Sequence, residues 1–125
     1  MLGRATPVLP AEDMARATKF YTDEMGLSVM FESEGGTAFQ ASDGTGIFVY
    51  PHERTLATHT AATFIVDDLD AVVRELRGRG VTFEDYDQPG LKTVDGIAEF
   101  EGMKSAWLVD SEGNIIAITE LPFKR

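Results

Sequence analysis

The chain has 125 residues, a formal net charge of −10 and no cysteine. This length suits one domain, and the lack of cysteine excludes disulfides, thiolate zinc sites and cysteine nucleophiles. The acidic balance argues against non-specific nucleic-acid binding, because that needs a basic surface. No apolar run is long enough to span a membrane and the N-terminus lacks the apolar core of a signal peptide, so a cytoplasmic location is the default expectation.

The first half of the chain predicts a βαβββ unit. Residues 4–9 are expected to form a strand, and "PAEDMARATKFYTDEMG" a helix that Asp13 caps and Gly26 ends. The segment "LSVMFES" alternates like a strand, and "TAFQAS" and "GIFVYP" follow glycine-containing turns. One helix and four strands are therefore expected in this half.

The second half predicts the same order of elements. Residues 60–66 are expected to form a strand, followed by a helix that Asp67 or Asp68 caps and Gly80 ends. The segment "VTFEDY" is predicted as a strand, residues 87–96 as a long loop, and "GIAEFEG", "KSAWLVD" and "NIIAITEL" as the remaining strands. The loop is interpreted as either a lid over a binding cleft or a simple connector.

The two halves can be aligned with one another, which indicates an internal duplication. Asp13 is matched with Asp68 at the start of each helix, and Phe39 with Trp107 in the strands. Near the end of each half, residues 46–49 are matched with residues 114–117. A single domain over 1–125 is expected, with module one at 1–57 and module two at 58–125.

This duplicated pattern resembles the vicinal oxygen chelate superfamily, which includes glyoxalase I, extradiol dioxygenases and bleomycin resistance proteins. The segments that carry the resemblance are "AEDMARATKFYTDEMGL", "FIVDDLDAVVRELRGRGV" and "LVDSEGNIIAITE". The resemblance implies an α+β fold in which two βαβββ modules form a curved, eight-stranded open barrel around a cleft. It says little about the reaction, because this scaffold hosts many activities. It also implies a homodimer.

In metal-using members of this superfamily, four strand positions supply His or Glu ligands to one divalent ion. The resemblance assigns these positions to Thr6, Val49, Ala61 and Ala117, and these side chains cannot together hold a divalent cation. No cofactor is therefore predicted, and a divalent metal is the alternative.

A displaced metal site is conceivable, because other His and Glu side chains lie near these strands. His59 lies two residues before Ala61, and with Glu99 it would supply two ligands of such a site. His52 lies in the connection between the halves, Glu120 is expected on the strand face opposite to Ala117, and both histidines are interpreted first as surface residues.

With apolar residues at the metal positions, the cleft is predicted to bind a small organic molecule that is aromatic or cationic. The candidate ligand-binding residues are aromatic or thioether side chains on or beside the strands: Phe39, Phe48, Tyr50, Phe64, Phe100, Met103 and Trp107. Asp95, Glu99 and Glu101 are expected to place negative charge at the mouth of the cleft.

Whether the chain is an enzyme stays open at this point. The first interpretation is a metal-independent binding protein of the bleomycin resistance type, without nucleic-acid or membrane partners. The alternative is a lyase, dioxygenase or isomerase of the same superfamily, which would use the displaced metal site or a carboxylate base. Glu99 and Glu101 are the candidate bases. A third possibility is a role in protein association.

Overall fold

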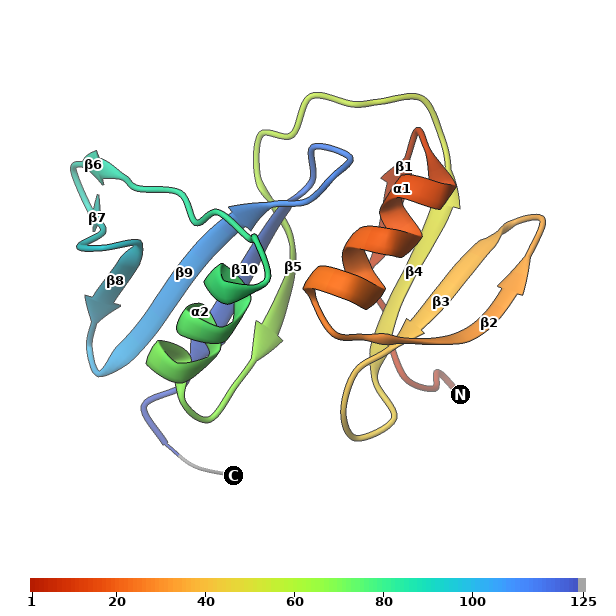
Figure 1. The fold of residues 1–125 in the computed structure, drawn as a ribbon. Helices are drawn as coiled ribbons and strands as arrows, with labels where there is room; N and C mark the ends of the chain where they lie inside the picture. The colour runs from red at the N-terminus through yellow and green to blue at the C-terminus, as the bar shows by residue number, and fades with distance from the viewer. Residues whose placement is uncertain (124–125) are drawn as a thin grey trace. The chain divides into compact units, whose positions relative to one another are not determined.

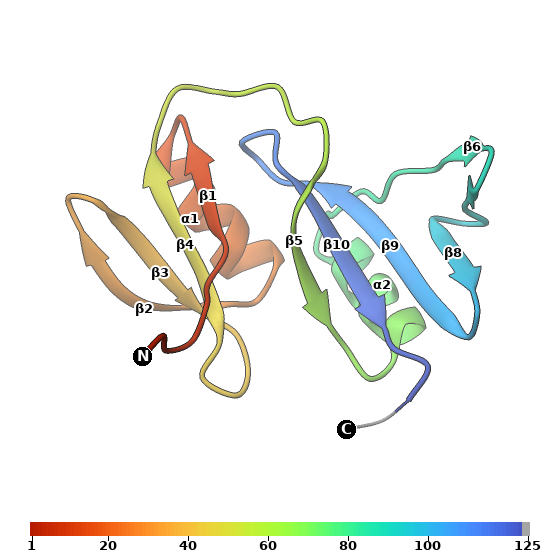
Figure 2. The same cartoon turned by 180° about the vertical axis from the view of Figure 1, so that it is seen from behind.

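The computed structural model describes residues 1–123 and divides into two compact units. The first unit comprises residues 1–61 together with Asp110–Asn114, and the second comprises residues 62–109 and the C-terminal part from Ile115. Each unit contains one four-stranded sheet with a helix against one of its faces (Figures 1 and 2). The predicted α+β fold with two βαβββ modules is confirmed at the level of these two units.

The first unit has the sheet order β1-β4-β3-β2, with β1 and β4 parallel and the other pairs antiparallel. Its elements are β1 (Val8–Ala11), α1 (Met14–Lys19), the π-helical turn η1 (Phe20–Glu24), β2 (Ser28–Ser33), β3 (Gly36–Gln40) and β4 (Gly46–Pro51). Asp13 caps α1 as predicted, because its side chain accepts a hydrogen bond from the Arg16 N–H at 3.0 Å. The first strand is shorter than expected, since only part of 4–9 is extended and paired.

The second unit repeats this plan with the sheet order β5-β10-β9-β8. Its elements are β5 (Thr60–Ile65), α2 (Leu69–Gly78), β6 (Asp87–Gln88), β7 (Leu91–Lys92), β8 (Ile97–Phe100), β9 (Met103–Val109) and β10 (Ile115–Glu120). Asp68 is the cap of α2 and accepts from the Ala71 N–H at 3.1 Å. The buried stripe of α2 contains Leu69, Val73 and Leu76.

Two predictions for the second unit are wrong. The segment "VTFEDY" is not a strand, because only Phe83 pairs with the sheet, in an isolated bridge to Leu108. Residues 87–96 are not an unstructured loop either, since β6 and β7 pair in a small hairpin around Gly90, whose φ is 82°. No helix among residues 1–123 is long and apolar enough to cross a bilayer.

Candidate ligand groove in the first module

The first unit has a groove of about 650 Å³ on the sheet face that α1 does not cover. Alternation along β4 explains which side chains face it. Ile47 and Val49 are buried on the helix side with Phe39, whose ring lies 5.5 Å from the ring of Tyr21. Phe48 pairs with Ala38 and therefore points to the opposite face, into the groove.

The apolar walls of this groove come from all four strands of the first sheet. Phe31 on β2 meets Phe48 with ring centroids 6.3 Å apart and a tilt of 38°. The pairing of β2 with β3 shifts between Val29 and Phe31, and this irregularity brings Met30 and Phe31 to the same lining. Val8, Met30 and Phe31 are each at least half exposed, so apolar surface remains open to a ligand.

Gly36 is required for the position of the Phe48 ring. Its φ is 147°, and a Cβ at this residue would lie 2.7 Å from Phe48 Cζ and 2.4 Å from the Val49 carbonyl oxygen. Real side chains do not approach so closely, and this backbone conformation favours glycine. The ring of Phe48 therefore lies directly over the backbone at Gly36.

Polar groups at one end of the groove come from the N-terminal segment and the turn before β4. The Arg4 guanidinium donates to the Gly44 carbonyl, and the Thr6 hydroxyl donates to the Gly46 carbonyl at 3.0 Å. Arg4 is the one charged side chain in the lining among the described residues. The groove thus combines an apolar body with a cationic end.

The strand register corrects one of the four positions at which the superfamily places metal ligands. Ile116 pairs with Leu108 and Ala117 with Trp107, whereas Ile47 pairs with Phe39 and Phe48 with Ala38. Phe48 and Ala117 each lie four residues after a turn glycine with positive φ, Gly44 and Gly113, so Phe48 is the counterpart of Ala117, and their strand partners Ala38 and Trp107 correspond in turn. The sequence alignment was therefore wrong by one residue in these strands, and Val49 lies in the core instead.

The residues at these positions do not fit a divalent metal. Phe48, Ala61 and Ala117 have no donor atoms, and the Thr6 hydroxyl is already bonded to the Gly46 carbonyl. Residues 1–123 also contain no group of three or more His, Asp or Glu side chains that could hold an ion.

The other predicted ligand-binding residues are distributed over both units. Phe39 belongs to the groove lining, although it is fully buried in the core of the first unit. Tyr50 shares the Phe48 face of β4 but is not part of the lining. Phe64 is half-buried in β5. In the second unit, Phe100 is 42% exposed beside the β8–β9 turn, and the half-buried Trp107 meets the edge of Tyr86 at 5.6 Å.

The half-buried Met103, which pairs with Phe100 at the start of β9, is the last of the predicted ligand-binding residues. Among the acidic candidates, Glu99 lies in β8 beside α2, and Glu101 is exposed in the β8–β9 turn with a φ of 52°. His52 and His59 are exposed, and the ring of His52 lies 5.6 Å from the ring of Tyr50.

A buried polar network behind the sheet of the first unit was not predicted from the sequence. Glu112 is 3% exposed and accepts hydrogen bonds from Arg16 Nε at 2.7 Å and from the Asp13 N–H at 2.9 Å. Burial raises the pKa of this carboxyl, but the hydrogen bonds from Arg16, Asp13 and Ser111 outweigh burial and lower the pKa to about 2. Glu112 is therefore an ionised anchor for α1.

The same loop holds η1 through a second carboxylate. The Tyr21 hydroxyl donates to Asp110 Oδ2 at 2.5 Å, and burial together with this carboxylate raises the pKa of Tyr21. The Asn114 amide donates to the Pro10 carbonyl at 3.0 Å and to Asp110 Oδ2 at 2.9 Å. These contacts fix the helix behind the groove and have a structural role.

A sequence model of the Glyoxalase/Bleomycin resistance protein/Dioxygenase superfamily matches residues 3–118. No curated protein matches the sequence.

Solved structures with the same fold are similar to the chain over nearly its whole length. TnmS3, an antibiotic binding protein from Streptomyces sp. CB03234, is 19% identical with a TM-score of 0.70 and covers 96% of this chain and 98% of its own. The fosfomycin resistance protein FosX from Listeria monocytogenes is 13% identical with a TM-score of 0.73, covering 97% and 94%. The oxidase ChaP-H2 is 20% identical with a TM-score of 0.70, covering 98% and 97%.

Proposed function

The chain belongs to the glyoxalase/bleomycin resistance protein/dioxygenase superfamily, and on this premise we propose that it is a metal-independent binding protein for a small aromatic molecule. The observation that carries the proposal is the place of Phe48. An aromatic ring occupies the β4 position that the resemblance to metal-using members assigns to a metal ligand, and this ring lines an open groove.

The size and lining of the groove support an organic ligand. Ligand pockets enclose about 300–1,000 Å³ and are mostly apolar with a few polar groups, and the groove of about 650 Å³ has this character. The rings of Phe31 and Phe48 offer stacking or edge contacts to a planar ligand. Met30 beside them adapts to different ligand shapes.

The sequence left both aromatic and cationic ligands open, and the lining favours the aromatic class. A cationic ligand would gain from the faces of the two Phe rings but would meet the guanidinium of Arg4. An aromatic ligand that is neutral or anionic avoids this repulsion. TnmS3 is an antibiotic binding protein with this fold, which supports a binding role.

The rival proposal is an enzyme that uses a carboxylate base or a displaced metal, and ChaP-H2 is an oxidase with this fold. Elemental analysis of protein purified without chelators separates the two functions. Our proposal predicts less than about one tenth of an equivalent of any divalent transition metal. One equivalent of bound metal per chain that disappears in the His59→Ala or Glu99→Gln variant would refute our proposal and support the metal-dependent enzyme.

The binding experiment uses the full chain and 8-anilinonaphthalene-1-sulfonate, an anionic aromatic probe whose fluorescence rises in apolar sites. We expect saturable binding that weakens about tenfold in Phe31→Ala, because one aromatic contact of roughly 1–2 kcal/mol is removed. Phe123→Ala is the matched control, since Phe123 is 63% exposed and lies outside the groove. Equal loss in both variants, or no binding by the parent chain, would overturn the proposal.

The homodimer implied by the superfamily is part of the same proposal. Size-exclusion chromatography with light scattering should give twice the chain mass of 13.7 kDa. A mass of one chain at micromolar concentration would contradict it.

A further inference from the structure

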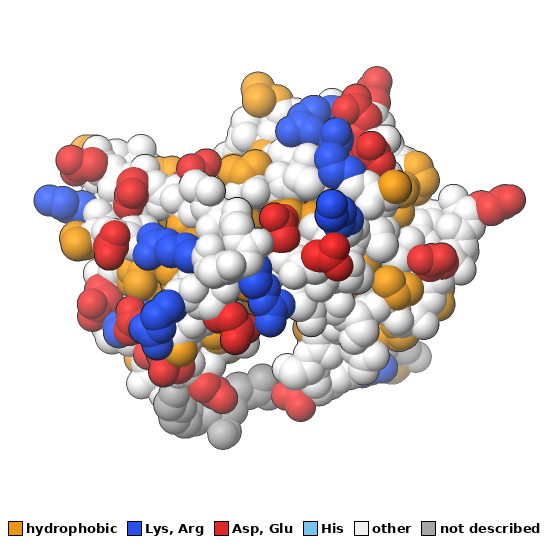
Figure 3. Space-filling view, in the orientation of Figure 1, with side chains coloured by type: hydrophobic (Ala, Val, Ile, Leu, Met, Phe, Trp, Pro, Cys, Tyr) orange, Lys and Arg blue, Asp and Glu red, His pale blue; other side chains and the backbone are white. Residues whose placement is uncertain are grey.

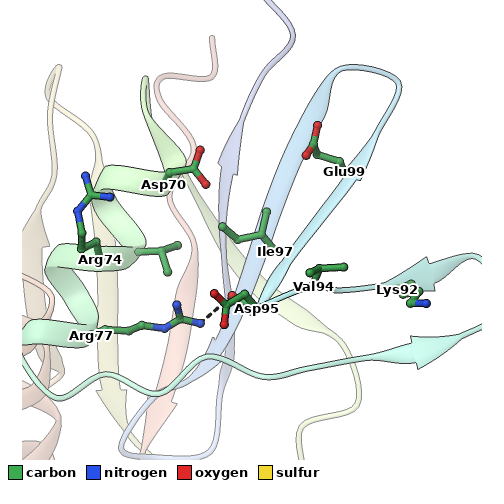
Figure 4. A pocket seen from close by; sticks show the side chains of 9 residues that line it. Asp70, Arg74, Arg77, Lys92, Val94, Asp95, Ile97 and Glu99 are labelled. Atoms are coloured by element: carbon green, nitrogen blue, oxygen red, sulfur yellow. Dashed lines mark hydrogen bonds between the residues drawn. The ribbon is translucent and has the colours of Figure 1, made fainter.

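A second pocket lies in the second unit, on the helix side of its sheet. It encloses about 670 Å³ between α2 and the segment from β7 to β8. Figure 4 shows Asp70, Arg74 and Arg77 projecting from α2, and Val94, Ile97 and Glu99 on the other side. The floor includes the side chain of Val73, which is 2% exposed.

The wall opposite α2 is held rigidly by side-chain hydrogen bonds. Asp85 accepts from the Gly96 N–H at 2.9 Å and from the Thr93 hydroxyl at 2.8 Å. Arg77 donates to the Asp95 carbonyl at 2.8 Å, and its guanidinium lies 5.7 Å from the centroid of the Phe83 ring. The pocket is therefore preformed, which lowers the entropic cost of binding.

The pocket presents both signs of charge around an apolar floor. The Asp70 carboxylate forms an ion pair with Lys104 at 2.9 Å, whereas the side chains of Arg74 and Lys92 make no hydrogen bond or ion pair within residues 1–123. Three of the 11 Lys and Arg residues of the chain line this pocket, together with three carboxylates. Figure 3 shows Lys and Arg side chains beside hydrophobic ones over α2.

This combination disfavours two simpler ligand classes. A purely anionic ligand would be attracted by Arg74 and Lys92 but repelled by Glu99 and Asp95, and a purely cationic one would meet the reverse. A zwitterion with an apolar body can place each of its charges beside lining residues of the opposite charge. Val73, Val94 and Ile97 would contact the apolar body, and 72% of Val94 is exposed and available for burial.

We propose that the pocket between α2 and β8 binds small zwitterions that carry an ammonium group and a carboxylate at the two ends of an apolar body. Arg74 on α2 receives the carboxylate, and Glu99 on the other side of the pocket receives the ammonium group (Figure 4). This inference does not depend on the proposed function, because its residues belong to the second unit and the groove belongs to the first.

The test is an NMR titration of the full, isotopically labelled chain with 6-aminohexanoate, hexanoate and hexylamine. The three probes share a six-carbon chain and differ only in their charged ends. We expect 6-aminohexanoate to shift the amide signals of Val94 and Ile97 and to bind about tenfold more tightly than either singly charged probe, since one additional charge-assisted contact contributes about 1.4 kcal/mol. Equal affinity for all three probes, or no shift at these amides, would overturn the proposal.

Two variants assign the ends of the ligand. Arg74→Gln should remove the advantage of 6-aminohexanoate over hexylamine, and Glu99→Gln should remove its advantage over hexanoate. Arg79→Gln is the matched control, because Arg79 ends the same helix and is paired with the exposed Glu75 outside the pocket. Undiminished affinity of Arg74→Gln for 6-aminohexanoate, or NMR shifts confined to Met30 and Phe48, would refute this site. Neither result would affect the proposal for the groove of the first unit.

Discussion

Replacement of Glu112 by Gln tests the polar anchor behind the groove. The carboxylate accepts four hydrogen bonds, two from Arg16 and one each from the Asp13 N–H and the Ser111 hydroxyl. These bonds overcome the cost of burial and lower the pKa from its ordinary value of 4.5 to about 2. At about 1.4 kcal/mol per pKa unit the difference corresponds to about 3 kcal/mol.

Because the Arg16 side chain is 47% exposed, solvent screening reduces the expected loss in Glu112→Gln to about 2–3 kcal/mol at pH 7. A depressed folded-state pKa stabilises the protein fully above pH 4.5, and this stabilisation is lost as the pH falls toward 2. The difference in the free energy of unfolding between the parent chain and the variant should therefore be roughly half as large at pH 3 as at pH 7.

The assay is urea unfolding followed by far-ultraviolet circular dichroism at both pH values. Glu34→Gln is the control, because Glu34 is an exposed carboxylate in the turn before β3, and it should change stability by less than about 0.5 kcal/mol. If Glu112→Gln lowers the free energy of unfolding by the same amount at pH 7 and at pH 3, Glu112 is not an ionised anchor.

Two further substitutions probe the groove and the second helix. Gly36→Ala should lower the free energy of unfolding by about 1–3 kcal/mol, because a side chain at φ 147° is strained and would collide with Phe48. It should also weaken binding of the aromatic probe. Unchanged stability and binding would contradict the packing of the Phe48 ring over this glycine. Asp68→Ala should cost about 1 kcal/mol by removing the cap of α2, measured by urea unfolding against Asp87→Ala, an exposed carboxylate in β6; equal effects in both variants would show that the cap contributes nothing.

The element order of the fold could be predicted because each signal is local. Asp13 and Asp68 are short acceptors directly before an apolar helical face, and Gly26 and Gly80 both adopt positive φ where the helices end. The segment "VTFEDY" has strand composition but lacks a partner over most of its length. Its structure depends on long-range pairing, which local composition does not determine.

The register near the end of each half could also have been predicted, but from a different residue. Gly46 was matched with Asn114, and this match places Val49 instead of Phe48 opposite Ala117. Gly44 and Gly113 both have positive φ, at 72° and 89°. An alignment on these two turn glycines places Phe48 opposite Ala117, because each lies four residues after its glycine.

The network around Glu112 could not be predicted from spacing alone. Asp110 and Glu112 belong to a turn sequence, and acidic residues in turns are usually solvated. Only the packing of residues 110–114 against α1 and η1 converts them into buried acceptors for Arg16 and Tyr21. These contacts join residues more than 80 positions apart, so no local pattern carries them.

The central claim is that the groove lined by Phe48 holds a small aromatic molecule. Methyl NMR tests it directly, because the chain has five methionines and Met30 lies in the groove. With methyl-labelled methionine and the anilinonaphthalene sulfonate probe, the Met30 signal should shift most, through the ring current of a bound aromatic group. A shift at Met103 in the second unit with an unmoved Met30 signal would contradict the account.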